Sequence, residues 1–260
     1  MTQQPVFSAT DFQAALTTRA IGRFLVYRPQ TDTTMILARR EADEGGPHGT
    51  MVLAEEQTAG RGRRGRSFFS PPGENLYFTM VLRLPLDVHR RLPVAVPLAV
   101  ADACAHEGVD ARIKWPNDIW VGERKLSGML IDAELTSDGA IAFPGIGVNV
   151  NGDPTLNPEL RDLATSLRRE LGKTVRRELL LARICNGLEA ALALPEQELL
   201  AAYRALSMIL GRRVTVSPIQ GPAFEAVAEA IREDGSLEVR SGDGAIEVVT
   251  AADVSLRPLG

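Results

Sequence analysis

An arginine- and glycine-rich segment at residues 60–66 is the part of this sequence best suited to bind an anion. It reads Gly-Arg-Gly-Arg-Arg-Gly-Arg, so four guanidinium groups alternate with three glycines. Glycine lets backbone N–H groups approach an anion closely, and arginine presents paired donors to a carboxylate or a phosphate. The segment is therefore predicted to close around a negatively charged ligand. From these residues alone, a solvated loop or a tract that binds RNA without reading its sequence stays open as an alternative.

A second segment, at residues 114–118, combines groups that suit a nucleotide and its metal ion. It reads Lys-Trp-Pro-Asn-Asp, and a Lys-Leu-Ser-Gly sequence that begins at Lys125 follows it. The proline interrupts a predicted strand and exposes Asn117 and Asp118 at a turn. A carboxylate is a hard ligand for Mg²⁺ that is itself bound to phosphates, and lysine is a compact cation that stabilises negative charge. Turn chemistry alone is the simpler interpretation of Asn117 and Asp118 taken by themselves.

Other familiar catalytic patterns do not fit this sequence. It contains no complete P-loop pattern, and no Gly-x-Gly-x-x-Gly turn is predicted to join a strand to a helix. The three histidines are widely spaced and have no cysteine or histidine neighbours at metal-ligand spacing. Neither a zinc site nor a histidine general base is therefore predicted.

The composition is that of an ordinary folded protein. With 260 residues, 45% apolar and 24% charged, the chain can form one large domain or two unequal ones. The longest apolar run, residues 92–101, is half the roughly 20 residues that a membrane helix needs, so no membrane association is expected. Two cysteines make no disulfide framework and the N-terminus has no signal-peptide pattern, which predicts a cytoplasmic location. The net charge of −4 argues against bulk electrostatic binding to nucleic acid.

Helices and strands are predicted in irregular alternation along the first half of the chain. These elements must position residues 60–66 and 114–118. Thr10 and Gln13 form a potential capping box, which predicts a helix that continues to about residue 20. Alternating apolar residues from residue 75 onward predict a strand with one buried face. The predicted elements are, in order, a helix at residues 10–20, a strand at 24–27, a helix at 34–43, and strands at 50–54 and 75–84.

The type of predicted secondary structure changes twice in the second half of the chain. A helix at residues 94–107 precedes a strand-rich block, in which a Ser-Asp-Gly turn at 137–139 predicts a hairpin. Helices are predicted from about residue 160 to 210, and short β runs separated by glycines follow. The strands predicted in the block are residues 111–115, 119–121, 126–135 and 140–150. The fold class predicted from this order is α+β, with a mixed β-sheet flanked by helices and a small C-terminal β-barrel.

Four segments, taken in order, resemble the signature of the biotin–protein ligases. They are residues 57–63 (Gln-Thr-Ala-Gly-Arg-Gly-Arg), 114–118, 125–128 and 145–150 (Gly-Ile-Gly-Val-Asn-Val), and residues 252–257 resemble the end of that family's C-terminal barrel. The resemblance implies formation of biotinyl-5′-AMP from biotin and MgATP. The biotinyl group would then pass to one lysine of a biotin carrier domain on acetyl-CoA carboxylase or a related carboxylase.

The resemblance also implies two domains and a set of site residues. Residues 1–210 would form the catalytic domain that binds biotin and ATP, and residues 211–260 an SH3-like β-barrel. Catalytic roles would fall to Arg63, Lys125 and Asp118. Biotin would be bound by Thr33, Thr34, Gln57, Gly60, Arg61, Gly62, Arg63, Lys125 and Gly128. The nucleotide would be bound by Arg61, Arg66, Lys114, Asn117, Asp118 and Asn149, with Asp118 holding Mg²⁺ through the phosphates.

The sequence departs from the family pattern at two places. The usual Ser-Thr-Asn of the biotin-site turn is Thr33-Thr34-Met35 here, and Met35 cannot donate an amide hydrogen bond. The usual Lys-Trp after the arginine segment is Ser67-Phe68, which keeps an aromatic wall without an indole N–H. Only about thirty residues precede the biotin-site turn, which indicates the short form of the family, without a DNA-binding domain.

Two other functions compete with this interpretation. A lipoate– or octanoate–protein ligase would carry out the same two reactions, adenylation and transfer to a lysine, on a similar fold. A nucleic-acid-binding module would use the arginine segment alone, against the acidic net charge. The expected partners are the biotin carboxyl carrier domain, biotin and ATP, with no DNA and no membrane, and the expected state is a monomer or a homodimer.

Overall fold

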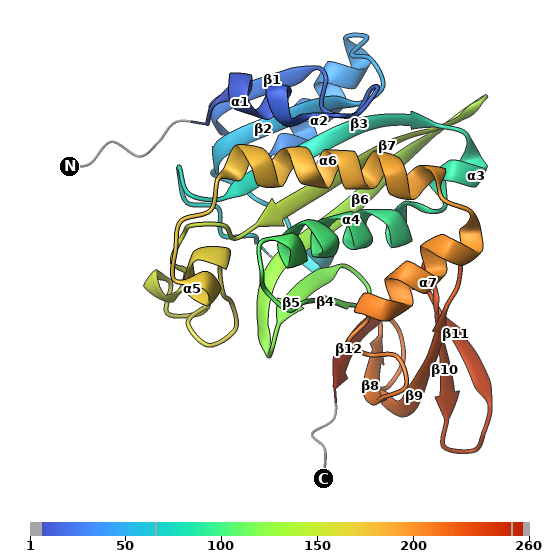
Figure 1. Cartoon of the computed structure of the whole chain (residues 1–260). Helices are drawn as coiled ribbons and strands as arrows, with labels where there is room; N and C mark the ends of the chain where they lie inside the picture. Colours follow the sequence, from blue (N-terminus) through green and yellow to red (C-terminus); the bar gives the residue numbers. More distant parts are fainter. Residues whose placement is uncertain (1–6, 66, 251, 257–260) are drawn as a thin grey trace.

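A seven-stranded mixed sheet is the frame of the molecule (Figure 1). The structure is a computed structural model that describes residues 7–65, 67–250 and 252–256. The strand order is β1-β2-β3-β7-β6-β5-β4, in which β1 and β2 run parallel and the other neighbours antiparallel. The strands are β1 (Leu25–Thr31), β2 (Thr50–Gln57), β3 (Leu76–Leu84), β4 (Ala111–Lys114), β5 (Asp118–Val121), β6 (Arg124–Thr136) and β7 (Gly139–Val148).

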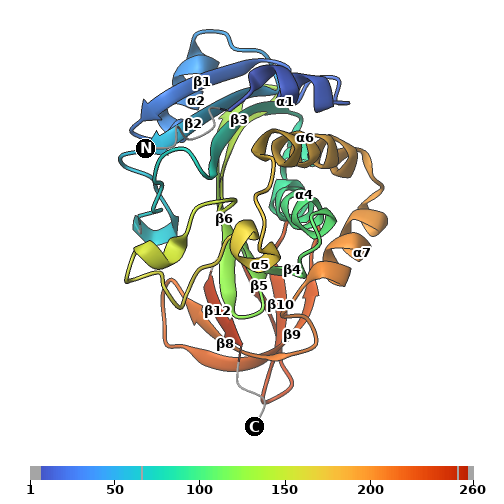
Figure 2. The same cartoon turned by 60° about the vertical axis from the view of Figure 1, so that its left-hand side comes forward.

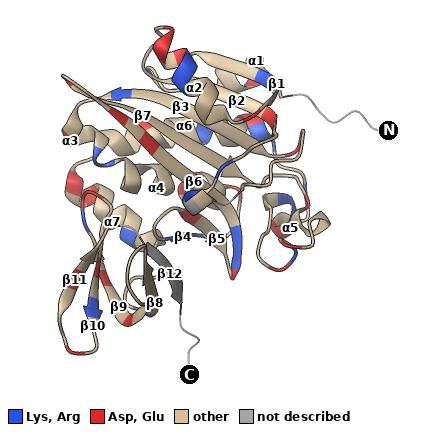
Figure 3. Ribbon diagram, turned by 180° about the vertical axis from the view of Figure 1, so that it is seen from behind, with Lys and Arg blue, Asp and Glu red and all other residues tan. Residues whose placement is uncertain are grey.

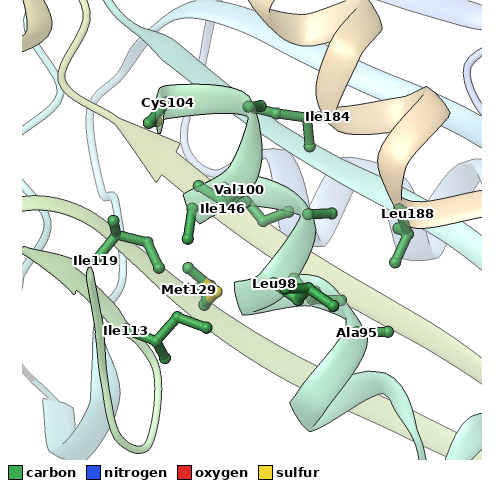
Figure 4. Packing of buried hydrophobic residues seen from close by; sticks show 14 of the residues in the cluster. Ala95, Leu98, Val100, Cys104, Ile113, Ile119, Met129, Ile146, Ile184 and Leu188 are labelled. Atoms are coloured by element: carbon green, nitrogen blue, oxygen red, sulfur yellow. The ribbon is translucent and has the colours of Figure 1, made fainter. Parts of the chain in front are cut away.

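Helices cover both faces of this sheet. The helices α4 (Leu92–His106) and α6 (Arg177–Ala193) pack against each other on one face, and Figure 4 shows Val100, Ile146 and Ile184 meeting in the core between them and the sheet. On the other face, α2 (Thr34–Asp43) covers β2, β3 and β7. It buries a smaller second core there, which consists of Met35, Ala38, Ala42, Val52, Val81 and Phe143.

The remaining helical elements are shorter than α4 and α6, and Figure 2 shows α7 beside α4. They are α1 (Ala9–Ala15), η1 (Arg63–Gly65), α3 (Leu86–His89), η2 (Pro154–Leu156), α5 (Leu167–Leu171) and α7 (Glu196–Leu206). A five-stranded antiparallel sheet of order β11-β10-β9-β8-β12 follows α7. Its strands are β8 (Arg213–Pro218), β9 (Phe224–Ile231), β10 (Leu237–Ser241), β11 (Ile246–Val249) and β12 (Ala252–Leu256). No helix among the described residues is long and apolar enough to cross a membrane.

Several predicted elements are confirmed. The α+β class and the mixed sheet flanked by helices are as expected, and α2 has the predicted bounds. The hairpin of β6 and β7 is closed by the pair Thr136 and Gly139, so the predicted turn joins the two strands. The predicted boundary at residue 210 falls between α7 and β8. That the two parts are separate domains stays a prediction.

The first helix and the first strand differ from the prediction. The helix is capped by Ser8, whose hydroxyl accepts a hydrogen bond from Asp11 N, and it ends at Ala15 instead of continuing to residue 20. It ends early because the following backbone N–H groups bond to side chains of α6, for example Thr17 N to Asn186 Oδ1 at 2.8 Å. The strand β1 continues to Thr31 because it pairs with β2 along that length, and a proline is tolerated on this edge strand.

The prediction that β3 buries only one face is wrong. Leu76, Phe78, Met80 and Leu82 pack into the core under α4 and α6, but the intervening residues are buried as well. Because α2 and the segments around it cover the second face of the sheet, those alternate positions face protein rather than solvent. One of them, Thr79, is a fully buried hydroxyl.

The C-terminal sheet packs tightly against the main layer. Trp115 Nε1 donates a hydrogen bond to Gly235 O at 2.7 Å, and the apolar side chains of β8 and β10 belong to the same buried cluster as α4. Gly235 has φ +79°, and a Cβ added there would lie 2.5 Å from Pro93 Cβ. Only glycine fits this conformation and this spacing, so the β9–β10 turn can rest on the beginning of α4.

We predict that Gly235→Ala destabilises the protein more than Gly244→Ala does. Gly244 also has a positive φ, but a Cβ there meets nothing within 4 Å. The control should lose about 1–2 kcal/mol from the left-handed backbone alone, and Gly235→Ala a further 1–3 kcal/mol, roughly, from overpacking. Urea unfolding of the whole protein measures both values. Equal losses in the two variants would contradict the docking of this turn on α4.

Candidate functional site

A cavity opens on the face of the sheet that carries α2, opposite α4 and α6; Figure 3 views the molecule from this side. Its lining comes from the beginning of α2, the end of β2, the arginine segment and strands β3, β5, β6 and β7. The predicted site residues that line it are Thr33, Thr34, Gln57, Arg61, Gly62, Arg63, Asn117, Asp118, Lys125 and Gly128. Residues that lie almost a hundred positions apart in sequence therefore meet in one cavity.

One corner of the cavity is a set of hydrogen-bonded polar side chains. Gln57 Oε1 accepts hydrogen bonds from Thr34 N at 2.9 Å and from Thr34 Oγ1 at 3.2 Å, and Gln57 Nε2 donates to Ser70 Oγ at 3.1 Å. Thr34 Oγ1 also lies 2.8 Å from Thr79 Oγ1. Thr33 accepts from Met35 N and so caps α2. These contacts hold the polar groups in place before any ligand arrives.

The floor of the cavity is backbone rather than side chain. Gly128 of β6 and Gly147 of β7 are directly opposite each other in the sheet, and Gly145 lies two residues before Gly147 on β7. A Cβ at Gly147 would lie 2.4 Å from the Phe68 ring, and one at Gly145 would lie 2.9 Å from Met35 Cε. At Gly147 the aromatic ring fills the place of a Cβ, so only glycine lets Phe68 lie against the sheet there, while a Cβ at Gly145 would require the flexible end of Met35 to shift.

The opposite end of the cavity is cationic. Lys125 Nζ lies 2.7 Å from Asp118 Oδ1, and Arg63 Nη1 donates to Asn117 Oδ1 at 3.2 Å. Asn117 Nδ2 donates in turn to Met129 O at 2.6 Å, which orients the amide. The two cations therefore project into the cavity from different elements, and each one has a polar partner on β5 or in the turn before it.

The backbone of Lys125 is held by a segment that returns to the site from β7. Lys125 N donates to Leu163 O, and Thr165 N donates to Lys125 O, each at 2.9 Å. Asn149 Nδ2 donates to Thr165 O at 3.0 Å and so helps to hold the same segment. Because both backbone groups of Lys125 are bonded, its position on β6 is well defined.

Some predicted residues do not line the cavity. Gly60 is buried behind it, where a Cβ would lie 2.5 Å from Phe68 O, and Asn149 bonds to Thr165 as described above. Lys114 Nζ lies over the Trp120 ring, 3.7 Å from its centroid. Arg66 lies outside the described residues.

Sequence reasoning missed part of the lining. These residues are Thr79, Met129, Leu130, Gly145, Ile146 and Gly147. A signal was present for some of them. Thr79 is the one polar residue in the otherwise hydrophobic run of residues 76–82, and the glycines of β7 lie in a segment that carried the family resemblance but received no residue-level role. Met129 and Ile146 belong to the core under α4 and α6 and border the cavity from the opposite face of the sheet, whereas Leu130 lies on the α2 side. The sequence does not separate the three, because only the sheet decides which face each one occupies.

The residues present suit a metal ion that obtains most of its ligands from a bound phosphate. Among the described residues there is no group of three or more His, Cys, Asp or Glu side chains that could hold a metal. Asp118 Oδ1 is buried and has no hydrogen-bond partner apart from its ion pair with Lys125. One carboxylate beside one amide is a fitting donor set for Mg²⁺, which keeps waters and phosphate oxygens as its other ligands.

Both parts of the chain match described protein families. Residues 27–151 match the Biotin/lipoate A/B protein ligase family, and residues 209–257 match the Biotin protein ligase C terminal domain. The biotin–[acetyl-CoA-carboxylase] ligase of Mycobacterium tuberculosis is 32% identical over 233 residues, which are 85% of this chain and 84% of that protein. The Bifunctional ligase/repressor BirA of Bacillus subtilis is 29% identical, over 96% of this chain and 79% of that protein.

Solved structures agree with these matches. The biotin protein ligase of Aquifex aeolicus in complex with biotin and ATP has a TM-score of 0.72 and 28% identity, and the match covers 90% of this chain and 99% of that one. The Leishmania major enzyme in complex with biotinyl-5-AMP has a TM-score of 0.61 and 25% identity, covering 88% and 99%. The resemblance inferred from the ordered motifs is confirmed: the chain belongs to the biotin–protein ligase family.

Proposed function

We propose that this protein joins biotin to a lysine of a biotin carrier domain, on acetyl-CoA carboxylase or a related carboxylase, through biotinyl-5′-AMP. One observation carries the proposal: a single cavity places a fixed polar corner, a floor without side chains and a cationic end in that order. Biotin has the same three parts, namely a polar ureido head, an apolar ring and chain, and a terminal carboxylate.

The polar corner suits the head group. Gln57 and Thr34 are already oriented by their mutual hydrogen bonds, so they can exchange bonds with a ureido group without reordering. Met35 stands where the family pattern has asparagine, and its side chain packs against the sheet at Gly145. The Phe68 ring, which packs on Gly147, would form an apolar wall for the ring and chain of biotin.

The cationic end suits the first reaction step. A carboxylate and a triphosphate repel each other, so an attack of the carboxylate oxygen on the α-phosphorus requires cations that lie close to both. Lys125 and Arg63 project into the cavity at this end, and Arg61 also lines it. We assign Lys125 to the reacting carboxylate and α-phosphate, and Arg61 and Arg63 to the carboxylate and phosphate oxygens.

Asp118 and Asn117 are the residues we assign to Mg²⁺ and ATP. Bound there, Mg²⁺ would neutralise the phosphates and make pyrophosphate a better leaving group. Asp118 also holds the ammonium of Lys125 at 2.7 Å. The carboxylate therefore keeps this cation in place until a negatively charged substrate takes over as its partner.

In the second step the ammonium of Lys125 has another role. When the carrier lysine attacks the acyl carbonyl, negative charge develops on the carbonyl oxygen and AMP leaves. A fixed ammonium beside that oxygen stabilises the charge without reorganising, which is the kind of interaction that contributes most to catalysis. Both steps need water excluded, and the arginine segment that borders the cavity is positioned to cover it.

Further assignments complete the proposal. Gly60 shapes the arginine segment from behind, and Arg66, Lys114 and Asn149 serve the nucleotide side. The protein is expected to work in the cytoplasm as a monomer or a homodimer, without binding DNA.

ATP–pyrophosphate exchange, with biotin, lipoate or octanoate offered in parallel, tests the proposed function. We expect exchange that depends on biotin, because the polar corner has donors and acceptors for a ureido group that lipoate and octanoate lack. The readout is labelled pyrophosphate that appears in ATP. Stimulation by lipoate or octanoate but not by biotin would overturn the proposal, and salt-sensitive RNA binding without any exchange would favour the nucleic-acid module instead.

We predict that Arg63→Ala and, separately, Lys125→Ala each lower biotin-dependent exchange by about 10²–10³-fold or more, because each removes a cation from the reacting anions. Arg204→Ala and Lys173→Ala are matched controls, since both side chains are exposed and lie outside the cavity lining. All four variants should keep the unfolding midpoint of the parent protein within a few degrees. Exchange at near the parental rate in either site variant would refute its assignment.

We predict that Gly147→Ala raises the KM for biotin by about tenfold, because the new Cβ displaces the Phe68 ring into the space above the floor. The KM for ATP should change less than twofold. Gly187→Ala is the matched control, since its Cβ would meet Ala99 at 3.7 Å, an ordinary contact. Steady-state exchange at varied biotin measures the effect, and an unchanged KM for biotin would contradict the role given to the glycine floor.

A further inference from the structure

The polar corner of the cavity changes to an apolar surface within three strands. A row of residues crosses the sheet there: Thr79 on β3 is directly opposite Gly145 on β7, which is directly opposite Leu130 on β6. On the β3 side of the glycine, the Thr79 hydroxyl lies 2.8 Å from Thr34 Oγ1. On the β6 side, Leu130 lines the cavity with a hydrocarbon side chain. The head-group end of the cavity is therefore polar on one side only.

Met35 covers the middle of this row. It lies in the first turn of α2, is 9% exposed, lines the cavity and belongs to the smaller second core. A Cβ built on Gly145 would lie 2.9 Å from Met35 Cε and 3.3 Å from Thr79 Oγ1, so the thioether methyl and the hydroxyl are neighbours at the glycine. A methyl group thus borders the polar corner, on a residue that is an asparagine in the family pattern.

The hydrogen-bonding groups at this end suit only part of a ureido head, which has one carbonyl oxygen and two N–H groups. Among the residues that the structure describes, the uncharged polar side chains that line this end come from β2, β3 and the beginning of α2, and they are Thr33, Thr34, Gln57 and Thr79. They can serve the carbonyl oxygen and one N–H. The Met35 thioether is at most a weak acceptor, and a leucine side chain has no acceptor.

We propose that Met35 is a specificity-determining residue, which gives one ureido N–H of biotin a methyl group as its neighbour instead of an acceptor. A site rejects an analogue strongly when the missing donor leaves a buried protein acceptor unpaired, whereas an apolar contact brings no such penalty. Biotin also gives up a hydrogen bond to water at that N–H, which an analogue with CH₂ there does not. The substrate class therefore extends from cyclic ureas to cyclic amides of the same size. The inference rests on the proposed function, because it takes this end of the cavity as the head-group site.

Two lactam analogues of biotin, each with CH₂ in place of a different ureido N–H, test the proposal. ATP–pyrophosphate exchange gives kcat and KM for biotin and both lactams, and calorimetry gives their Kd values. In the parent protein we expect one lactam to keep kcat/KM within about tenfold of biotin and the other to lose more, because only the second takes a partner from the polar corner. The differences should appear in KM and Kd, with kcat changed less than about threefold, because the head group is remote from the reacting carboxylate.

Met35→Gln places an amide on an unbranched side chain of similar length. The new acceptor should make the tolerated lactam at least about tenfold worse, relative to biotin, than it is in the parent, and leave the ratio for the other lactam unchanged. Met35→Leu is the matched control: it keeps an apolar side chain of similar volume, so both parental ratios should persist. Met35→Asn, which restores the family residue, carries the test if the Met35→Gln protein fails to fold.

The outcomes separate the two levels of inference. A parent protein that does not bind biotin overturns the proposed function. A parent protein that uses biotin but treats the two lactams alike overturns the inference alone, because the two N–H groups then have equivalent surroundings. So does a Met35→Gln variant that keeps both parental ratios. A Met35→Leu variant that changes them as Met35→Gln does also overturns it, because the shape of methionine would then be responsible instead of its lack of an acceptor.

Discussion

A ligand can lie flat on a β-sheet only where the strands carry no side chains, and the whole site depends on this condition. Gly128 and Gly147 are cross-strand neighbours and Gly145 lies two residues away, so a patch of bare backbone occupies the middle of β6 and β7. The side chains of Phe68 and Met35 already rest on that patch at distances that exclude a Cβ. A substrate chain bound above the sheet would meet the same constraint.

The order of the strands explains why the polar and charged groups meet over this floor. The strand β7 lies between β3 and β6, so Thr79 is on one side of the glycines, and Lys125 and Asp118 are on the other. The hairpin of β6 and β7 places residues 125–128 beside residues 145–150. The chain enters β3 directly after residues 60–71, so the arginine segment lies above these two strands. One sheet thus supplies a polar corner, an apolar middle and a cationic end.

Much of the fold was predictable from local sequence. The helix α2 has the predicted bounds because a threonine cap, a helical apolar face and a terminal pair of glycines all indicate the same element. The hairpin turn at residues 137–139 follows from local turn chemistry in the same way. The prediction failed where tertiary contacts replaced local ones: α1 stops at Ala15 because α6 side chains take its next N–H groups, and β3 is buried on both faces because α2 covers the second one.

The same distinction between local sequence and tertiary contacts applies to the site. The sequence by itself predicted which groups have the capacity for the chemistry, because arginines among glycines, a lysine, and an Asn-Asp turn have that capacity wherever they are, and their ordered spacing identified the family. Only the tertiary structure decided which residues face the cavity: Thr79 and Leu130 line it, while Gly60 and Asn149 stand behind it. The reason is that the face of a strand depends on its register and on what packs against it, and both are set by partners far away in the chain.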